Sequence, residues 1–386
     1  MKELEFQDII WEKREYWGNF FEDIKSDEIK FDSKDHKKLL INYTINRVNK
    51  KLSVIHDQVR SGRLTDKERN YRTSDNKLLK VDFIGQSNDE EFVVEIKTNK
   101  NAERNSATEL NAYTKALTRN EPLLNPDQTL SVNITNFHSG ISKESYLKEI
   151  IYTDKKTIAY NYIYENNKIH LSPVLLTEND IPEHHIKFQQ HTVNCFKVTF
   201  QKINGTIQEA PEGGLLDSHS KLHYAQFCSN LLADLKYKGH HGCIIGKTLW
   251  DENRYILKDN EGNRYKKDGN EIYIYLINPY ICPVRIEKYS IGKKQQLIEE
   301  FLNKYFISNF HISLVTSPSN SNTFWNDQHI FFQSFGMLDE LCLAWSKTES
   351  ARDQFDELNY SINNYSIIKS VEIFTAFLED IDYYFL

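Results

Sequence analysis

Two acidic residues and a lysine lie in neighbouring apolar segments, and no other residues in the chain are as well suited to chemistry. Residues 80–84 carry Asp82, and residues 92–97 carry Glu95 and Lys97. Side chains alternate between the two faces of a strand, so Glu95 and Lys97 share one face while Phe92, Val94 and Ile96 point to the other. The pattern predicts a pair of strands with a charged face.

The turn formers between the two segments predict a hairpin. If its loop is centred between Asn88 and Asp89, Asp82 falls directly opposite Glu95. Opposed side chains of antiparallel strands have Cβ atoms about 4.5–5.5 Å apart. Two carboxylates at that separation repel, and neither charge suits an apolar strand. Local rules broken in this way are typical of a functional site.

A divalent cation would relieve the repulsion. Mg²⁺ is commonly held by one or two carboxylates, with waters and phosphate oxygens as its other ligands, and Mn²⁺ can substitute for it. Lys97 could orient or deprotonate an attacking water and offset phosphate charge. These parts suit metal-assisted hydrolysis of a phosphodiester. The residues alone leave a second interpretation open, an ordinary hairpin in which Lys97 pairs with Glu95 or Asp82.

Asp82 followed by Glu95-Ile96-Lys97 resembles the signature of the PD-(D/E)XK nuclease superfamily, which includes restriction enzymes, repair nucleases and antiviral nucleases. The resemblance covers roughly residues 35–120. It implies that Asp82 and Glu95 are metal ligands and that Lys97 is the catalytic lysine. The implied fold is α/β, a mixed α+β arrangement of the restriction-endonuclease-like kind, with a central mixed sheet flanked by helices and the acidic hairpin at its centre.

The sequence departs from the pattern of that superfamily in several places. Val81 stands where Pro often precedes the first acid. Many members add an acid from a preceding helix, and here Glu68 is the best candidate and Asp57 the next. One branch carries Gln-x-x-x-Tyr on the following helix. Here Glu109 replaces the Gln and Tyr113 keeps the Tyr, although Tyr113 also fits a simple core position.

The rest of the chain predicts two domains. Helical spacing dominates before a basic loop at residues 61–76, and proline-containing residues 120–127 form a break. We therefore expect a nuclease-like domain with N-terminal helices over 1–125. A second α+β domain over 126–386 would select substrate, oligomerise or bind a partner, and it would end in an acidic helical stretch from residue 339.

The charge is unevenly distributed. The whole chain has a formal net charge of −7, but residues 339–386 alone hold ten acids against three bases, so the remainder is balanced. Residues 51–80 hold eight bases against four acids. A basic patch of this kind can be a solvated face or a nucleic-acid contact. The residues expected to contact nucleic acid are Arg60, Arg63, Arg69, Arg72 and Lys80.

These features together predict a cytoplasmic, Mg²⁺-dependent endonuclease that acts on DNA. The distribution of the superfamily adds a role in bacterial defence or restriction. Two alternatives remain: a nucleic-acid-binding module with a vestigial core that serves a partner enzyme, and a ribonuclease on the same scaffold. Five cysteines without a CxxC pair suggest reduced thiols. The lack of a long apolar run predicts no membrane association, and self-association or a protein partner is expected through the C-terminal region.

Overall fold

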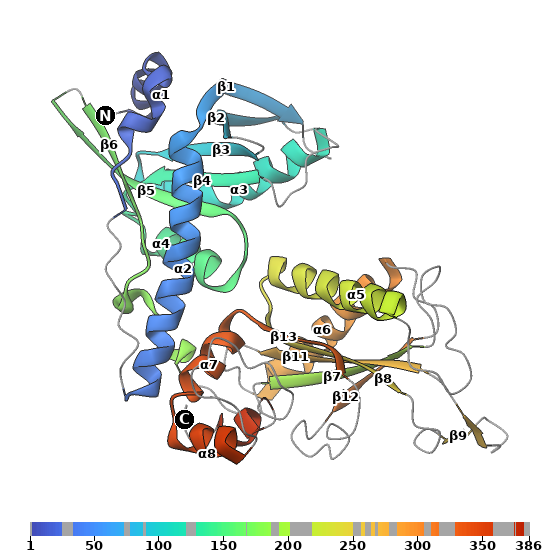
Figure 1. Cartoon of the computed structure of the whole chain (residues 1–386). Coiled ribbons are helices and arrows are strands. Elements are labelled where there is room, and N and C mark those ends of the chain that lie inside the picture. Colours follow the sequence, from blue (N-terminus) through green and yellow to red (C-terminus); the bar gives the residue numbers. More distant parts are fainter. Residues whose placement is uncertain are drawn as a thin grey trace. The chain divides into compact units, whose positions relative to one another are not determined.

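The computed structural model describes most of the chain, and every structural statement below concerns the described residues. These are residues 2–24, 34–72, 78–87, 90–120, 129–166, 168–186, 193–200, 218–249, 256–258, 264–266, 269–277, 284–304, 310–315, 329–357, 374 and 376–381. The chain divides into two compact units, which we describe separately (Figure 1). The first comprises residues 1–30 and 44–181, and the second comprises residues 31–43 and 182–386.

The first unit is built on a six-stranded mixed sheet with the order β1-β2-β3-β4-β5-β6 (Figure 1). Strands β3, β4 and β5 are parallel, and the remaining pairs are antiparallel. Helix α3 connects β3 to β4, and α4 connects β4 to β5, as parallel neighbours require. The elements of this unit are α1 (Glu3–Glu12), η1 (Arg14–Phe20), α2 (His36–Ser61, of which residues 44–61 belong to this unit), β1 (Arg63–Arg72), β2 (Leu78–Ser87), β3 (Glu90–Lys97), α3 (Lys100–Asn120), β4 (Thr129–Thr135), α4 (Gly140–Tyr152), β5 (Thr157–Glu165), β6 (Lys168–Pro173) and η3 (Glu178–Asp180).

The predicted hairpin is confirmed, including its register. Strands β2 and β3 pair antiparallel from Ser87↔Glu90 to Phe83↔Val94. Asp82 and Glu95 are the next residues beyond the last pair, at the point where the two strands separate. The turn itself, residues 88–89, lies outside the described residues.

Residues 61–76, expected to be a loop, instead contribute strand β1, which pairs with β2 from Arg63↔Gln86 to Arg72↔Leu78 with a bulge between Leu64 and Asp66; residues 73–76 lie outside the described residues. The expectation was wrong because the segment contains almost no apolar residues, which a central strand would need. Strand β1 lies at the edge of the sheet, where charged side chains can face water and also discourage edge-to-edge pairing. Only Leu64 and Tyr71 of this strand are buried hydrophobic residues.

The predicted boundary at residue 125 also needs correction. It falls between β3 and β4, which are hydrogen-bonded neighbours over seven residues from Glu91↔Thr129 to Lys97↔Thr135. Strand β5 then pairs with β4, and β6 closes the far edge. The first unit therefore extends to residue 181, and β4 supplies the strand next to the charged residues.

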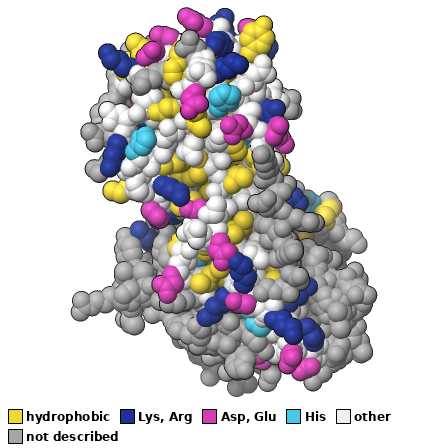
Figure 2. Space-filling view, turned by 90° about the vertical axis from the view of Figure 1, so that its left-hand side faces the viewer, with side chains coloured by type: hydrophobic (Ala, Val, Ile, Leu, Met, Phe, Trp, Pro, Cys, Tyr) yellow, Lys and Arg dark blue, Asp and Glu magenta, His cyan; other side chains and the backbone are white. Residues whose placement is uncertain are grey.

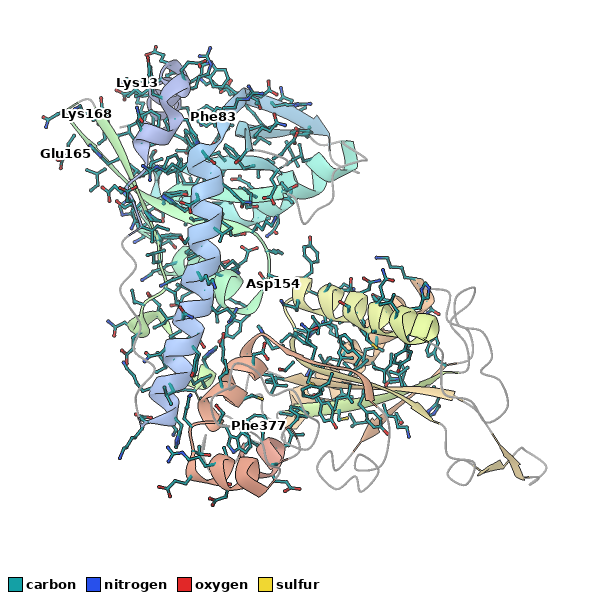
Figure 3. All side chains as sticks on the ribbon, viewed as in Figure 1. Lys13, Phe83, Asp154, Glu165, Lys168 and Phe377 are labelled. Carbon is teal, nitrogen blue, oxygen red and sulfur yellow. The ribbon has the colours of Figure 1, made fainter. Side chains whose placement is uncertain are left out.

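Apolar packing on both faces holds the hairpin in place. On one face, Val93 and Ile84 pack against Leu110 and Tyr113 of α3. On the other, Phe92 stacks on Trp17 with ring centroids 6.2 Å apart. Phe83, labelled in Figure 3, stacks on Trp11 of α1. Because the second half of β3 is covered on both sides, Glu95 and Lys97 are buried as well.

The second unit has a five-stranded antiparallel sheet with the order β12-β7-β11-β8-β13. Helices α5 and α6 cover one face with apolar side chains. The edge of Tyr275 meets Phe374 from the C-terminal stretch, 5.0 Å between centroids. The elements are η4 (Glu183–His185), β7 (Val193–Phe200), α5 (Ser218–Tyr237), β8 (His241–Leu249), β9 (Ile256–Lys258), β10 (Arg264–Lys266), β11 (Gly269–Ile277), α6 (Val284–Lys304), β12 (Phe310–Val315), β13 (His329–Phe335), α7 (Met337–Trp345) and α8 (Glu349–Glu357).

The acidic C-terminal stretch contributes to the core of the second unit. Leu341 and Trp345 of α7 are fully buried, and Trp345 packs against Phe377. The four described cysteines are free and buried, in keeping with reduced thiols. Among the helices that the structure describes, none combines the length and the apolar character needed to cross a bilayer.

The close packing of the hairpin yields a first prediction. A Cβ added at Gly85 would lie 2.0 Å from the ring of Phe92, which cannot yield because it is buried against Trp17. Gly85→Ala should therefore lower the free energy of unfolding by about 1–3 kcal/mol, the usual cost of overpacking. Urea denaturation followed by circular dichroism measures it. Gly140→Ala is the matched control, because a Cβ there meets no atom within 4 Å; an equal loss in both variants would contradict the packing argument.

Candidate active site

Strands β2 and β3 separate at Asp82, and this carboxylate occupies the point where they part. The ladder between them ends at Phe83↔Val94. Beyond it, the backbone N–H of Ile96 donates to Asp82 Oδ2 at 2.7 Å. Gln7 of α1 donates through Nε2 to Asp82 Oδ1 at 2.8 Å. Each oxygen of Asp82 thus has one donor, which sets the orientation of the carboxylate and leaves further lone pairs available.

Glu95 and Lys97 lie on the face of β3 that α3 covers. Their side chains form an ion pair, and Lys97 Nζ also lies 3.0 Å from Glu109 Oε2 of α3. Glu95 is 1% exposed and Lys97 is 8% exposed. The period-two prediction of a shared charged face is therefore confirmed, but the face is covered by a helix instead of being solvated.

The site holds more negative than positive charge. Three carboxylates, Asp82, Glu95 and Glu109, stand against the single ammonium of Lys97, a formal balance of −2. Burial raises the pKa of Asp82 to about 6, against the lowering effects of the Ile96 N–H and Lys97. Burial and the charge of Asp82 raise the pKa of Glu95 well above its ordinary value. Burial alone would lower the pKa of Lys97, but Glu95 and Glu109 raise it above its usual range.

Helix α3 supplies two residues that lie one turn apart. Glu109 reaches Lys97, as described above, and Tyr113 donates its hydroxyl to the carbonyl oxygen of Lys80 at 2.8 Å. That carbonyl belongs to the part of β2 that no longer pairs with β3. Tyr113 is 5% exposed and packs in the core, as expected, but its hydroxyl also ties α3 to the strand of Asp82. Burial, then Glu95 and Glu109, raises the pKa of Tyr113.

The two candidates for an additional acid do not join this cluster. Glu68 adopts a positive φ of 57° on β1, and its carboxylate pairs with Lys80 Nζ at 2.7 Å. Asp57 is exposed on α2. Glu109, which the sequence pattern pointed to only as a replacement for Gln, is the third carboxylate that the structure brings to the site.

The predicted nucleic-acid contacts are largely engaged with acids of the same unit. Arg60 pairs with Asp23, Arg69 with Asp66 at 3.1 Å and Lys80 with Glu68. Arg63 is exposed on β1, and the side chain of Arg72 lies outside the described part of the chain.

The basic patch is therefore weaker than its sequence suggests. Asp23 lies outside residues 51–80, as does Asp8, which pairs with Lys67. Counting these two partners lowers the local charge from +4 to +2. Figure 2 shows one face of the molecule, on which basic and acidic side chains are interspersed. Exposed ion pairs contribute little to stability, however, and phosphate groups can compete for such cations.

The residues present fit a divalent cation. Glu95 Oε2 is buried and has no hydrogen-bond partner, although an unpaired buried carboxylate oxygen is costly. A hard cation such as Mg²⁺ prefers oxygen ligands and would also offset the excess negative charge. Among the described residues, no three His, Cys, Asp or Glu side chains gather closely enough to hold an ion by themselves. Asp82 and Glu95 would therefore need further oxygen ligands, from water, from substrate or from another type of side chain.

Sequence reasoning missed Gln7. It is 4% exposed and lies 75 residues before its partner Asp82, on a helix whose pattern shows only ordinary amphipathic spacing. The one signal that could have indicated it is a polar residue at the otherwise apolar face of α1, next to the buried Phe6 and Ile10.

Comparisons with known proteins add little to this description. No family model and no curated protein matches the sequence. Among solved structures, an XisH family protein from Nostoc punctiforme aligns over 33% of this chain and 95% of its own, with 15% sequence identity and a TM-score of 0.22. A similarity at this score is too weak to assign a function.

The raised carboxyl pKa values predict how stability depends on pH without added metal. A carboxyl whose pKa is raised on folding stabilises the folded state only while it is protonated. Its contribution is complete below the ordinary pKa of about 4 and is lost as the pH rises through the folded-state value. Melting temperature should therefore fall as the pH rises through about 6, the pKa of Asp82, and on towards the higher pKa of Glu95.

Glu95→Gln should flatten this decline and raise the melting temperature at pH 8 by about 3 °C or more, the shift expected for roughly 1 kcal/mol in a domain of this size. Glu165→Gln is the control, because Glu165 is exposed at the tip of the β5–β6 hairpin (Figure 3). Melting curves in EDTA over a series of pH values measure the effect. A decline that is as steep in Glu95→Gln as in the wild type would contradict it.

Proposed function

We propose that the chain is a divalent-metal-dependent nuclease that hydrolyses phosphodiester bonds of DNA, with Asp82 and Glu95 as metal ligands. The observation that carries the proposal is the proximity of two carboxylates, half-buried Asp82 and buried Glu95, at the point where β2 and β3 separate, with Lys97 in contact with Glu95. The resemblance to the PD-(D/E)XK pattern rests on the same three residues. When bound, Mg²⁺ would polarise the phosphate and lower the pKa of a coordinated water.

Asp82 is held ready for such a role by its surroundings. The Ile96 N–H and the Gln7 amide fix its two oxygens, so the carboxylate does not have to reorganise when a ligand arrives. Preorganised polar groups of this kind supply much of the rate enhancement in enzymes. Glu95 interacts electrostatically with Asp82, and its buried Oε2 has no hydrogen-bond partner.

Lys97 is suited to donate hydrogen bonds rather than to remove a proton. Its ammonium lies between two carboxylates, Glu95 and Glu109, and both favour the charged form. A charged lysine cannot accept the proton of water, but it can orient a water or a phosphate oxygen and stabilise developing negative charge. Glu109 has a side chain that is 35% exposed, so it connects Lys97 to solvent.

The exposed edge strand β1 supports nucleic acid as the substrate. It pairs with β2, the strand of Asp82, and carries Arg63 and Arg69. Arg69 also lies over the ring of Tyr71, 5.4 Å from its centroid. A cationic strand next to the candidate site would track the backbone of a nucleic acid through its phosphates.

Removing each site residue tests the proposal. Asp82→Ala and Glu95→Ala should each lower the rate of Mg²⁺-dependent cleavage by about 100-fold or more, the usual cost of losing a central electrostatic group. Lys97→Ala should be equally inactive yet still bind metal, because Lys97 is not a ligand. The assay uses plasmid, linear duplex, single-stranded DNA and RNA, each with Mg²⁺ or with EDTA.

Glu165→Gln, remote from the site on the β5–β6 hairpin, should cleave at the wild-type rate (Figure 3). Near wild-type cleavage by Asp82→Ala or Glu95→Ala would show that the site is misassigned. Cleavage of RNA alone would redirect the proposal to a ribonuclease, and binding of DNA without any cleavage would favour the vestigial module.

The basic edge strand gives a separate prediction. Replacing Arg63 and Arg69 with Gln should weaken DNA binding and reduce the slope of log affinity against log salt by up to about 2. Each phosphate contact releases counterions from the DNA, so a variant that makes fewer contacts releases fewer counterions on binding. Lys148 and Lys168 form the matched control pair. They are exposed on α4 and on β6, the strand at the opposite edge of the sheet. Fluorescence anisotropy at several salt concentrations measures both; equal slopes in the two double variants would assign β1 to solvation.

A further inference from the structure

Asn133 extends the row of oxygen-bearing side chains across a third strand. It lies on β4, directly beside Glu95 in the parallel register of β3 and β4. Side chains of neighbouring residues in such a register point to the same face, with strands about 4.8 Å apart. Asn133 and Glu95 therefore lie side by side, and Asp82 lies just beyond the last β2–β3 pair, close enough to Glu95 to interact with it electrostatically.

A chain of hydrogen bonds determines which end of the Asn133 amide is free. Ser106 of α3 donates its hydroxyl to the backbone oxygen of Glu103 at 2.9 Å. A hydroxyl has one proton, so towards Asn133 the oxygen of Ser106 can only accept. Asn133 Nδ2 donates to it at 3.2 Å. The amide nitrogen is therefore engaged with α3, and the amide oxygen is not.

The amide oxygen of Asn133 is buried and has no hydrogen-bond partner. The same is true of Glu95 Oε2 on the adjacent strand. Asn133 is 6% exposed and Glu95 is 1% exposed. Two buried acceptor atoms without a hydrogen-bond partner each cost free energy. A cation between them would satisfy both acceptors at once.

We propose that Asn133 Oδ1 is a third protein ligand of the divalent cation, beside Asp82 and Glu95. The inference rests on the proposed function and adds a ligand to the same site. A carboxylate-only site is incomplete in this chain, because no three acidic, His or Cys side chains of the described residues gather to hold an ion. Side-chain amide oxygens are ordinary ligands of hard cations, and the excess of carboxylates over Lys97 draws a cation to this place.

Calorimetric titration of the full-length protein with Mg²⁺ and with Mn²⁺ tests the proposal. Asn133→Leu keeps the volume but removes the oxygen, and it should weaken binding of both ions about tenfold or more. Ser131→Ala is the matched control. It removes a hydroxyl from the same strand, one that meets Thr114 of α3 and has no part in the proposed site, so the affinity should stay within about twofold of wild type.

Asn133→Cys gives a second measurement that is independent of how well the leucine variant folds. A thiolate prefers soft ions, so direct ligation should shift the affinity ratio of Cd²⁺ to Mg²⁺ by about tenfold or more in favour of Cd²⁺. A folded Asn133→Leu protein with wild-type affinity, or an unchanged ratio in Asn133→Cys, overturns the role of Asn133 and leaves Asp82 and Glu95 as ligands. Such a result would mean that a shared proton satisfies Glu95 and Asn133. Absence of saturable Mg²⁺ or Mn²⁺ binding in the wild type overturns the proposed function as well.

Discussion

The burial of charge beneath α3 is the constraint on which the first unit depends. Glu95 and Lys97 occupy a strand that is covered on both faces, and Asp82 stands at its edge. An isolated buried carboxylate is strongly unfavourable, and three elements supply compensating groups. Helix α1 gives the amide of Gln7, β3 gives the Ile96 N–H, and α3 gives the carboxylate that holds the second side of Lys97.

That compensation is incomplete, and the uncompensated charge indicates a functional site. Lys97 neutralises one charge of three, and Glu95 Oε2 remains without a partner. An apolar residue in place of Glu95 would pack with α3 at no such cost, as Val93 does two residues earlier on the same face. The sheet therefore bears a local penalty at this position, which a bound cation would offset. Proteins commonly hold such locally unfavourable arrangements at functional sites.

The architecture of the sheet explains how a site arises in a continuous hydrogen-bonded structure. Strand β2 stays paired with β1 on both sides of Asp82, between Leu78 and Gln86, but leaves β3 beyond Phe83. The backbone groups released there are satisfied by side chains: Asp82 takes the N–H of Ile96, and Tyr113 donates to the carbonyl of Lys80. Separation of the strands thus creates space for functional side chains without leaving these backbone groups unpaired, and α3 anchors both sides of the gap.

The sequence by itself determined the hairpin, its register and the shared face of Glu95 and Lys97, because strand periodicity and loop length are local properties. It also predicted α3 and the core position of Tyr113.

Tertiary structure decided what local patterns do not encode. Strand β1 forms from a segment with few apolar residues because an edge strand needs only one paired side and one buried face. The unit continues past residue 125 because β4 pairs with β3, and this pairing cannot be predicted from the local sequence pattern. Gln7 reaches Asp82 from 75 residues away, and Asn133 stands beside Glu95 only because the two strands are parallel neighbours. Such long-range juxtapositions depend on how whole elements pack, which is why residue types and spacing indicated the chemistry but not the complete set of side chains around it.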